Sequence, residues 1–348
     1  MMYYKYYGIL QKYDKLNTLS KNASNLLNLK FENENSTSIS TSLPICISLS
    51  GGVDSMVLLD LLLRTNKRII AIHVNYNNRD ESKLEEEFLR GYCEARDIEF
   101  ICHSFDFKRG SINRNIYENL TKKIKFGVYK SILQKYNAEN ILLAHHKDDI
   151  IENIFTNFCR GDNFLNLSVI KEYSTILGVN IYRPLLNFYK DDIYDYAHYY
   201  EVPYFLDTTP DWSVRGKFRR RILPELFNTF PGLKSNLLGI AKESEEWGSL
   251  IQSDFIDKYL NKVSAYDNYI DMPIISGEDY STFPVCFWQE IISRVFHRYS
   301  LSAPSRKSLN VFIEYLKNKQ SNQILLKYNT KINIDILNNI IKITFSDN

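Results

Sequence analysis

The chain has 348 residues, of which 44% are hydrophobic and 24% are charged, with 25 Tyr and 20 Phe. This length exceeds what one hydrophobic core usually serves, and the composition excludes fibrous and low-complexity proteins. Because the formal net charge is only +2, any affinity for nucleic acid has to come from local basic clusters. The five cysteines include no C-x-x-C pair, which disfavours a disulfide framework and a zinc or iron–sulfur site.

Residues 1–42 are expected to form an N-terminal extension that is partly flexible. Residues 20–42 are rich in Ser, Asn and Thr and have weak apolar patterning, which disfavours a packed segment. The start of the chain lacks a basic segment followed by an unbroken apolar run, and no stretch approaches the roughly 18 apolar residues that span a bilayer. We therefore expect a cytoplasmic protein.

From residue 43 onward, short apolar runs alternate with segments of helical periodicity. The runs that predict strands cover residues 44–50, 68–76, 98–105 and 140–146, and the segments that predict helices cover 55–65, 81–96 and 118–136. Strands that alternate with helices predict an α/β fold with a doubly wound parallel sheet. In such sheets the ligand crevice lies beyond the carboxyl ends of the strands, so we look for the site in the loops that follow them.

The second half of the chain has a different pattern. A further helix is predicted over 190–202, one long amphipathic helix over 233–260, and two more over 284–300 and 305–318. Residues 324–345 alternate in strand fashion around Asn338-Asn339, which predicts a terminal hairpin. We therefore expect an α/β domain over 43–232 and a smaller, mainly helical domain with a terminal β-hairpin over 233–348.

The hexapeptide Ser50-Gly-Gly-Val-Asp-Ser55 follows the first predicted strand. Its two glycines allow a tight turn whose N–H groups approach an anion, and the start of the next helix adds its positive dipole end. Asp54 would repel a phosphate unless a Mg²⁺ ion lay between them. A helix cap would explain Asp54 or Ser55 alone but not the whole hexapeptide. The hexapeptide therefore predicts a site for phosphates and a divalent cation.

This hexapeptide resembles the S-G-G-x-D-S motif of the pyrophosphatase-loop (PP-loop) ATPases, which have an adenine nucleotide alpha hydrolase-like fold. These enzymes cleave ATP between its α and β phosphates. GMP synthetases, asparagine synthetases, thiouridylases and lysidine synthetases share the motif, so it implies the reaction type and not the acceptor. The resemblance implies ATP and Mg²⁺ as cofactors, with Asp54 as a metal ligand. The implied phosphate-binding residues are Ser50, Gly51, Gly52, Val53, Asp54 and Ser55.

The segment His145-His-Lys-Asp-Asp-Ile-Ile-Glu152 follows the fourth predicted strand. It resembles the H-H-x-D-D-Q-x-E-T box of tRNA(Ile)-lysidine synthetases and related thiolating enzymes, although Ile150 and Asn153 replace Gln and Thr. Carboxylates beside imidazoles can supply a metal ligand and a general base, whereas the alternative is a solvated acidic face. The resemblance implies catalytic roles for His145, Asp148, Asp149 and Glu152 together with Asp54, and a metal-binding role for Glu152.

Other segments are similar to the same family. Residues 73–82 resemble H-V-x-H-x-x-R-x-x-S with Tyr76 in place of the second His, and the implied adenine-binding residues are His73 and Val74. Residues 118–126 resemble E-x-x-A-R-x-x-R-Y with lysines in place of the arginines, and residues 183–186 match R-P-L-L. The resemblance implies contacts to substrate or tRNA from Arg79, Glu118, Lys122, Lys125, Arg160, Arg183, Asp207, Arg215 and Arg219.

The region from Arg215 to Arg221 is strongly basic, with five Lys or Arg in seven positions. Such a cluster predicts contact with RNA phosphates, although a basic helix end is often only a solvated face. Gly216 stands where the resembled family has Asn, so the acceptor, lysine in that family, is less well indicated than the adenylation step.

The resemblance implies a ligase of the tRNA(Ile)-lysidine synthetase type. Such an enzyme activates C2 of a tRNA cytidine by adenylating its O2 with ATP, after which free L-lysine attacks C2 and AMP leaves. The resemblance implies that residues 43–232 form the ATP-binding catalytic domain and that the domain over 233–348 contacts the tRNA. The implied partners are the anticodon loop of an isoleucine tRNA and lysine, and a homodimer is left open. The alternatives are a tRNA thiolase that uses the same adenylation step, a non-catalytic RNA- or nucleotide-binding derivative, and small-molecule amidation.

Overall fold

The structure is a computed structural model, and its contacts divide the chain into two compact units between Lys242 and Glu243. This division falls inside α9 (Leu233–Ile251), whose first residue coincides with the expected domain boundary. The expected extension, residues 1–42, lies outside the described residues. The structure describes residues 43–65, 67–77, 81–105, 114–161, 167, 170–206, 214–266, 269–275, 277–298, 303–327, 330–335 and 338–345.

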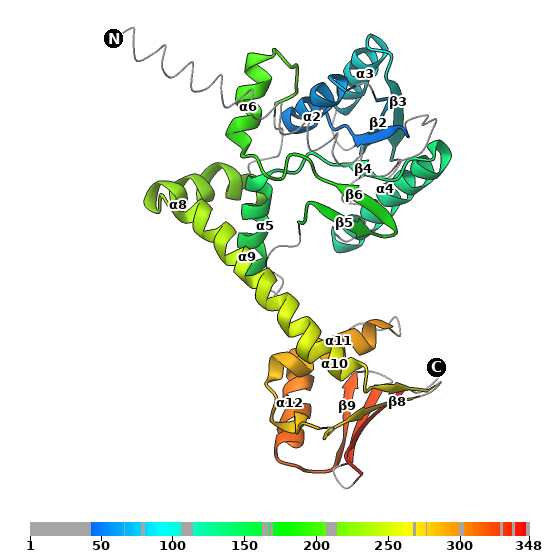
Figure 1. Cartoon of the computed structure of the whole chain (residues 1–348), viewed down its shortest axis with the longest axis vertical. Coiled ribbons are helices and arrows are strands. Elements are labelled where there is room, and N and C mark those ends of the chain that lie inside the picture. Colours follow the sequence, from blue (N-terminus) through cyan, green and yellow to red (C-terminus); the bar gives the residue numbers. More distant parts are fainter. Residues whose placement is uncertain are drawn as a thin grey trace, which may run out of the picture. The chain divides into compact units, whose positions relative to one another are not determined.

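The first unit contains a six-stranded sheet in the order β3-β2-β1-β4-β6-β5 (Figure 1). Its strands are β1 (Ile45–Ser48), β2 (Ile69–Asn75), β3 (Glu99–Ser104), β4 (Ile141–Leu142), β5 (Tyr173–Ile176) and β6 (Val179–Tyr182). All neighbouring pairs are parallel except β5 and β6. The predicted parallel α/β sheet is confirmed. The antiparallel edge was not predicted, and it arises from a tight hairpin whose two turn residues, Leu177 and Gly178, both have positive φ.

Helices cover both faces of this sheet. Ile45 and Ile47 of β1 pack in one core with α2 (Val53–Leu63), α3 (Glu81–Glu94) and α6 (Lys190–Tyr199). The alternate residue of β1, Cys46, packs on the other face with α4 (Arg114–Tyr136). Burial on both faces explains why these strands are continuous apolar runs.

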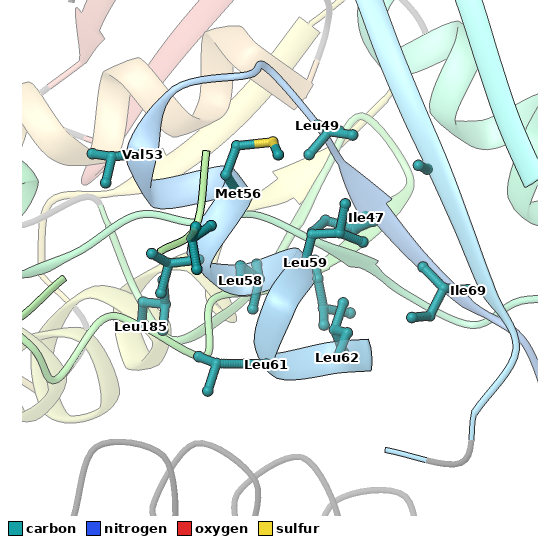
Figure 2. Close-up of a cluster of buried hydrophobic side chains, with 14 of the residues drawn as sticks. Ile47, Leu49, Val53, Met56, Leu58, Leu59, Leu61, Leu62, Ile69 and Leu185 are labelled. Atoms are coloured by element: carbon teal, nitrogen blue, oxygen red, sulfur yellow. The ribbon is translucent and has the colours of Figure 1, made fainter. Parts of the chain in front are cut away.

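The core beside β1 fixes where the loop after this strand begins and ends. Figure 2 shows Ile47 and Leu49 beside Met56 and Leu59 of α2, with Leu185 close to the same helix. Each fully buried aliphatic side chain of this kind contributes about 1.5–3 kcal/mol to folding. The strand and the helix on either side of the hexapeptide are therefore held rigidly, and the turn between them is short.

The order of the strands reverses at β1, because β2 lies on one side of it and β4 on the other. A loop after β1 leads into α2, and a loop after β4 leads into α5 (Lys147–Arg160). In open parallel sheets the two loops at such a reversal separate and leave a crevice at the carboxyl ends of the strands. The two motifs predicted from the sequence therefore start from neighbouring strands at this crevice.

A helical segment after the sheet packs on α5. It consists of α7 (Val214–Lys217), the π-helical η2 (Phe218–Ile222), α8 (Leu223–Thr229) and the start of α9. Phe218 is buried and its ring lies 5.0 Å from that of Phe155 on α5. Ile154 of α5 packs with Ala241 of α9. The basic run that includes η2 is thus anchored beside the acidic start of α5.

The second unit combines helices with a five-stranded antiparallel sheet in the order β7-β8-β11-β10-β9. Its strands are β7 (Ser264–Ala265), β8 (Tyr269–Pro273), β9 (Asn322–Lys327), β10 (Thr330–Asp335) and β11 (Ile340–Phe345). The strands β10 and β11 pair antiparallel on either side of Asn338-Asn339, as their alternation predicts. The sheet is larger than the predicted hairpin, because β8 joins it by pairing with β11, far along the chain.

Helices in this unit follow the predicted segments closely. The long helix continues from α9 through the π-helical η3 (Gln252–Ile256) into α10 (Asp257–Leu260). A 3-10 turn, η4 (Tyr280–Thr282), precedes α11 (Val285–Arg298), which is followed by α12 (Arg306–Lys317). Their core gathers around Trp288. None of the helices in the described part of the chain has both the length and the apolar character needed to cross a membrane.

We expect Gly51→Ala to lower the free energy of unfolding by about 1–2 kcal/mol, the cost of a left-handed conformation in a non-glycine residue. Gly51 has φ +83°, and an added Cβ would lie 3.0 Å from Cδ2 of Phe205. Gly127→Ala in α4 is the control, since its Cβ would meet nothing within 4 Å, and it should raise stability by about 0.5–1 kcal/mol. Urea unfolding measures both, and equal effects of the two substitutions would contradict the role of Gly51.

Candidate nucleotide and acid–base site

The turn after β1 is braced by its own serines. The Oγ of Ser55 accepts a hydrogen bond from the backbone N–H of Ser50 at 3.2 Å, donates to the carbonyl of Gly52 at 3.0 Å, and lies 3.1 Å from the Oγ of Ser50. Gly52 is the extended residue before α2, and the side chain of Val53 is buried in the core. The hexapeptide therefore forms a fixed turn at the start of a helix, where backbone N–H groups lack intrahelical acceptors.

A cavity of about 280 Å³ opens beside this turn. Its lining includes both predicted adenine-binding residues and consists of Ser48, Leu49, Ser50, His73, Val74, Asn75, Tyr76, Ser82, Glu85, Lys125 and Tyr129. The Nδ1–H of buried His73 donates to the carbonyl of Leu49 at 2.8 Å. Mixed apolar and polar lining of this extent is typical of small-molecule sites. Ser50 belongs to both the cavity and the turn, so one ligand can occupy the two together.

Lys125 supplies the basic group of this cavity. Burial, and then the charge of Lys122, lower the pKa of Lys125. Burial removes part of the water that solvates the ammonium. An anionic ligand in the cavity would compensate for this loss and stabilise the charged form of Lys125.

The carboxylate of Asp54 is held by a lysine from another helix. The Nζ of Lys190, the first residue of α6, lies 2.7 Å from both carboxylate oxygens. The Nε2 of His146 lies 3.6 Å from Oδ1 of the same carboxylate. His146 also lies 3.3 Å from Asp149. Its ring therefore joins the turn after β1 to the acidic start of α5, as the sequence predicts for these two motifs.

The acidic residues of α5 are all paired with basic residues. Asp148 accepts hydrogen bonds from the backbone N–H of Lys190 at 2.8 Å and from the Nζ of Lys234 at 2.7 Å. Glu152 lies 2.7 Å from Arg215 and 2.5 Å from Arg219. The alternative of a solvated acidic face is therefore wrong for these positions.

Asp149 is the most enclosed of these acids, with 11% of its side chain exposed. It accepts from Arg219 at 2.9 Å and from the backbone N–H of His146 at 3.1 Å. Burial acts to raise the pKa of Asp149, but its interactions with His146, His145 and Arg219 outweigh burial, so the pKa lies below its ordinary value. Asp149 therefore stays ionised and is a weak base.

His145 is fixed by a buried arginine. The Nε–H of Arg183 donates to Nδ1 of His145 at 3.0 Å, and its Nη1 donates to the carbonyl of Lys171 and the hydroxyl of Ser174. Burial, with a contribution from Arg183, lowers the pKa of His145 to about 4. His145 is thus a neutral imidazole whose Nδ1 accepts a hydrogen bond, so its proton resides on Nε2.

Arg183 is itself only 4% exposed. Burial lowers its pKa, and within the described residues all its hydrogen-bond acceptors are uncharged. In this structure its contacts position His145, whereas the sequence predicted contact with substrate or tRNA.

The remaining predicted residues lie elsewhere or outside the described part of the chain. Arg160 is at the last turn of α5, about 20 Å along that helix from its acidic start. Glu118 and Lys122 are exposed on α4. Arg79 and Asp207 lie outside the described residues.

Sequence reasoning did not single out His146, Lys190 or Lys234 as site residues. A signal was present for Lys190, because a lysine at the first position of a helix opposes the helix dipole and needs a compensating anion. Lys234 occupies the first turn of α9 and could have been questioned on the same ground.

Asp54 has the chemistry of a magnesium ligand. An ammonium already stands against both of its oxygens, and Mg²⁺ is usually held by one or two carboxylates together with phosphates and water. Among the residues that the structure describes, no group of three or more His, Cys, Asp or Glu could hold a metal ion. A single carboxylate such as Asp54 could hold Mg²⁺ only together with other ligands, such as phosphates and water. Glu152 could join it only if its two arginine contacts opened.

The family described as PP-loop domain matches residues 20–226. The chain is 30% identical over 230 residues to the tRNA(Ile)-lysidine synthase of Streptococcus sanguinis, a match that covers 65% of this chain and 52% of that protein. It is 26% identical over 302 residues to the tRNA(Ile)-lysidine synthase of Francisella tularensis subsp. holarctica, covering 83% and 75%. The chain thus spans about half the length of the first of these relatives.

A solved structure shares the fold. It is the U34-tRNA thiolase NcsA from Methanococcus maripaludis with its [4Fe-4S] cluster, which is 19% identical, with a TM-score of 0.50, and the match covers 67% of this chain and 80% of the thiolase.

Arg219→Met is expected to lower the free energy of unfolding by about 2 kcal/mol, since it removes charged hydrogen bonds from two mostly buried carboxylates. Arg215→Met should cost at most about 1 kcal/mol, because the side chain of Arg215 is 58% exposed. Chemical denaturation at neutral pH measures both values. Equal losses would show that burial does not distinguish the two arginines.

Arg183→Met should raise the pKa of His145 from about 4 toward its ordinary value of 6.5, because it removes a nearby positive charge. Between these pH values folded wild-type protein binds fewer protons than unfolded protein, so its stability falls as the pH is lowered from 6.5 to 4. The variant should lose less stability over that interval.

NMR titration of the histidine rings measures this pKa directly. Lys171→Met is the matched control, because Arg183 contacts only the backbone carbonyl of Lys171 and that carbonyl remains. An unchanged His145 titration in Arg183→Met would refute the assignment.

Proposed function

The chain belongs to the PP-loop family, and we propose that it is a ligase of the tRNA(Ile)-lysidine synthase type, which adenylates a tRNA cytidine with ATP and transfers lysine to it. The names of its relatives support this substrate and this product. The observation that carries the proposal is the meeting of two motifs at one crevice. The ring of His146 lies 3.6 Å from Asp54 of the turn after β1 and 3.3 Å from Asp149 of α5.

In the first step, the O2 of cytidine attacks the α-phosphate of ATP, and pyrophosphate leaves. The turn from Ser50 to Ser55 would bind the phosphates through its N–H groups, and the cavity that includes His73 would bind the adenosine. A Mg²⁺ ion held by Asp54 would offset the charge that develops on the pyrophosphate. Lys125, which lines the cavity, and Lys190, which contacts Asp54, are candidates for ammonium groups that would neutralise the same charge.

In the second step, the amine of lysine attacks C2 of the adenylated cytidine, and AMP leaves. The amine has to lose a proton, and the ionised acids at the start of α5 are suited to attract a cationic lysine and hold it there. The depressed pKa of Asp149 makes this residue a poor proton acceptor. We therefore assign Asp149 to binding and orientation, and leave proton transfer to Asp148 or Glu152.

Basic residues of α7 and η2 would hold the RNA. Arg220 and Arg221 are exposed on η2, next to Arg219. Phosphate contacts would give salt-dependent affinity, and a cytidine from an anticodon loop can be turned out of its stack into the crevice. An isoleucine tRNA and free L-lysine are the specific substrates that we propose.

A thiolase that uses the same first step is less well supported. Thiolation by a protein nucleophile needs a cysteine that ionises readily. Burial raises the pKa of Cys46 to about 12 and that of Cys93 to about 11, and burial with Glu86 raises that of Cys102 to about 11. These three thiols are therefore poor nucleophiles at neutral pH. The other two, Cys159 and Cys286, are exposed, but neither lines the cavity, and Cys159 lies in the last turn of α5, far along that helix from its acidic start.

With an unmodified tRNA pool, ATP and lysine, we expect the tRNA to gain the mass of one lysine less one water. Asp54→Asn should lower the rate of this reaction by about 10²–10³-fold, the usual cost of losing one group that stabilises developing charge. Asp191→Asn is the control, because Asp191 is an exposed acid one position after Lys190, and its rate should stay near that of the wild type.

Mass spectrometry of nucleosides from the digested tRNA measures the product. Replacement of oxygen by sulfur, seen when a sulfur donor is added, would favour the thiolase. No ATP-dependent product with either donor would reject the proposed ligase.

A further inference from the structure

Both the side chain and the backbone of Lys190 contact carboxylates of the site. Its side-chain ammonium lies 2.7 Å from each oxygen of Asp54, and its backbone N–H donates to Asp148 at 2.8 Å. The two side chains of this ion pair are 27% and 25% exposed. Within the described part of the chain, Asp54 is the only carboxylate in ion-pair contact with this ammonium. One residue of α6 therefore connects the turn after β1 with the start of α5.

The position of Lys190 in its helix makes this contact necessary. It is the first residue of α6, where the N–H groups and the helix dipole already present positive charge. An ammonium at such a place is favourable only beside an anion, and in this structure the anion is Asp54. If Asp54 took another cation, the ammonium would need a different anionic partner.

The carboxylate of Asp54 is the group that would hold a divalent cation, and the ammonium of Lys190 now lies against both of its oxygens. Binding of Mg²⁺ to Asp54 has two costs. The cation loses some of its bound water, which it does reluctantly, and the contact between Asp54 and the ammonium of Lys190 has to break. With no other anion present, that exchange leaves the charge of Lys190 uncompensated at a helix start. When the phosphates of a nucleotide are present, the ammonium can move onto their oxygens. Binding of the metal and binding of the nucleotide should therefore favour each other.

We propose that Lys190 is a resident counter-ion of Asp54, which keeps a divalent cation off the turn after β1 until the phosphates of a nucleotide accept the ammonium. This inference rests on the proposed function in one respect, since it takes Asp54 as the ligand of the cation that accompanies ATP. The inference adds a positioning role for Lys190. It also predicts that the metal binds weakly on its own and tightly together with the nucleotide.

The test measures binding of Mn²⁺ alone to the full-length protein, by the electron paramagnetic resonance signal of free Mn²⁺. Without nucleotide, Lys190→Met should bind Mn²⁺ about tenfold more tightly than the wild type, a usual size for coupling between two sites. Lys190→Arg keeps the charge and should bind as weakly as the wild type. Lys147→Met is the matched control, because it removes a lysine at the start of α5 whose amine lies over the ring of Tyr189.

A non-hydrolysable ATP analogue supplies the second arm. It should raise the Mn²⁺ affinity of the wild type strongly and that of Lys190→Met much less. The double substitution Asp54→Asn with Lys190→Met should abolish the gain seen without nucleotide. Thermal unfolding of each variant verifies that it is folded.

The proposal is overturned if Lys190→Met gains no more Mn²⁺ affinity than Lys147→Met, or if the gain survives in the double variant. Neither result would bear on the proposed ligase activity, which the lysine-transfer assay tests separately. Conversely, a protein that transfers no lysine to tRNA and still shows the Lys190 effect would reject the proposed acceptor and keep the metal–lysine exchange.

Discussion

The neutralisation of four carboxylates at one sheet edge is the constraint on which this site depends. Asp54 lies in the first turn of α2, and Asp148, Asp149 and Glu152 lie in the first two turns of α5. Like charges gathered at one edge of a sheet repel strongly when water is partly excluded. Lysines and arginines from α6, α7, η2 and α9 contact them. The helices that follow the sheet are therefore part of the site, because without them the acids would not remain together and ionised.

This arrangement also explains why the same basic residues are suited to two kinds of partner. An arginine that forms a fork around a carboxylate can form a similar fork around a phosphate. Arg215 is more than half exposed while it contacts Glu152. In the proposed complex with tRNA, RNA phosphates could therefore compete for Arg215 at little cost. Arg219 is less exposed and is better suited to keep Asp149 and Glu152 in place.

The strands and the two motifs were predictable from the sequence, because they depend on local pattern. A buried strand followed by a glycine turn and an apolar helix has a recognisable order of residues, and the structure has β1, Gly51 and α2 in that order. The larger antiparallel sheet was only partly predictable. Alternation around Asn338-Asn339 indicated β10 and β11, but β8 finds its partner far along the chain. Local periodicity contains no information about such pairing.

What the amino-acid sequence determined by itself is the parallel α/β sheet, the glycine turn after its first strand and the acidic start of the helix after its fourth. These follow from residue types and spacing within short segments, and the family match agrees with them. The tertiary structure decided which lysine or arginine pairs with which carboxylate. Lys190 and Asp54 are 136 positions apart, and Arg219 and Asp149 are 70 apart. Pairs at such separations are fixed by the strand order and by helix packing, so the protonation and the availability of each acid became visible only once the chain was folded.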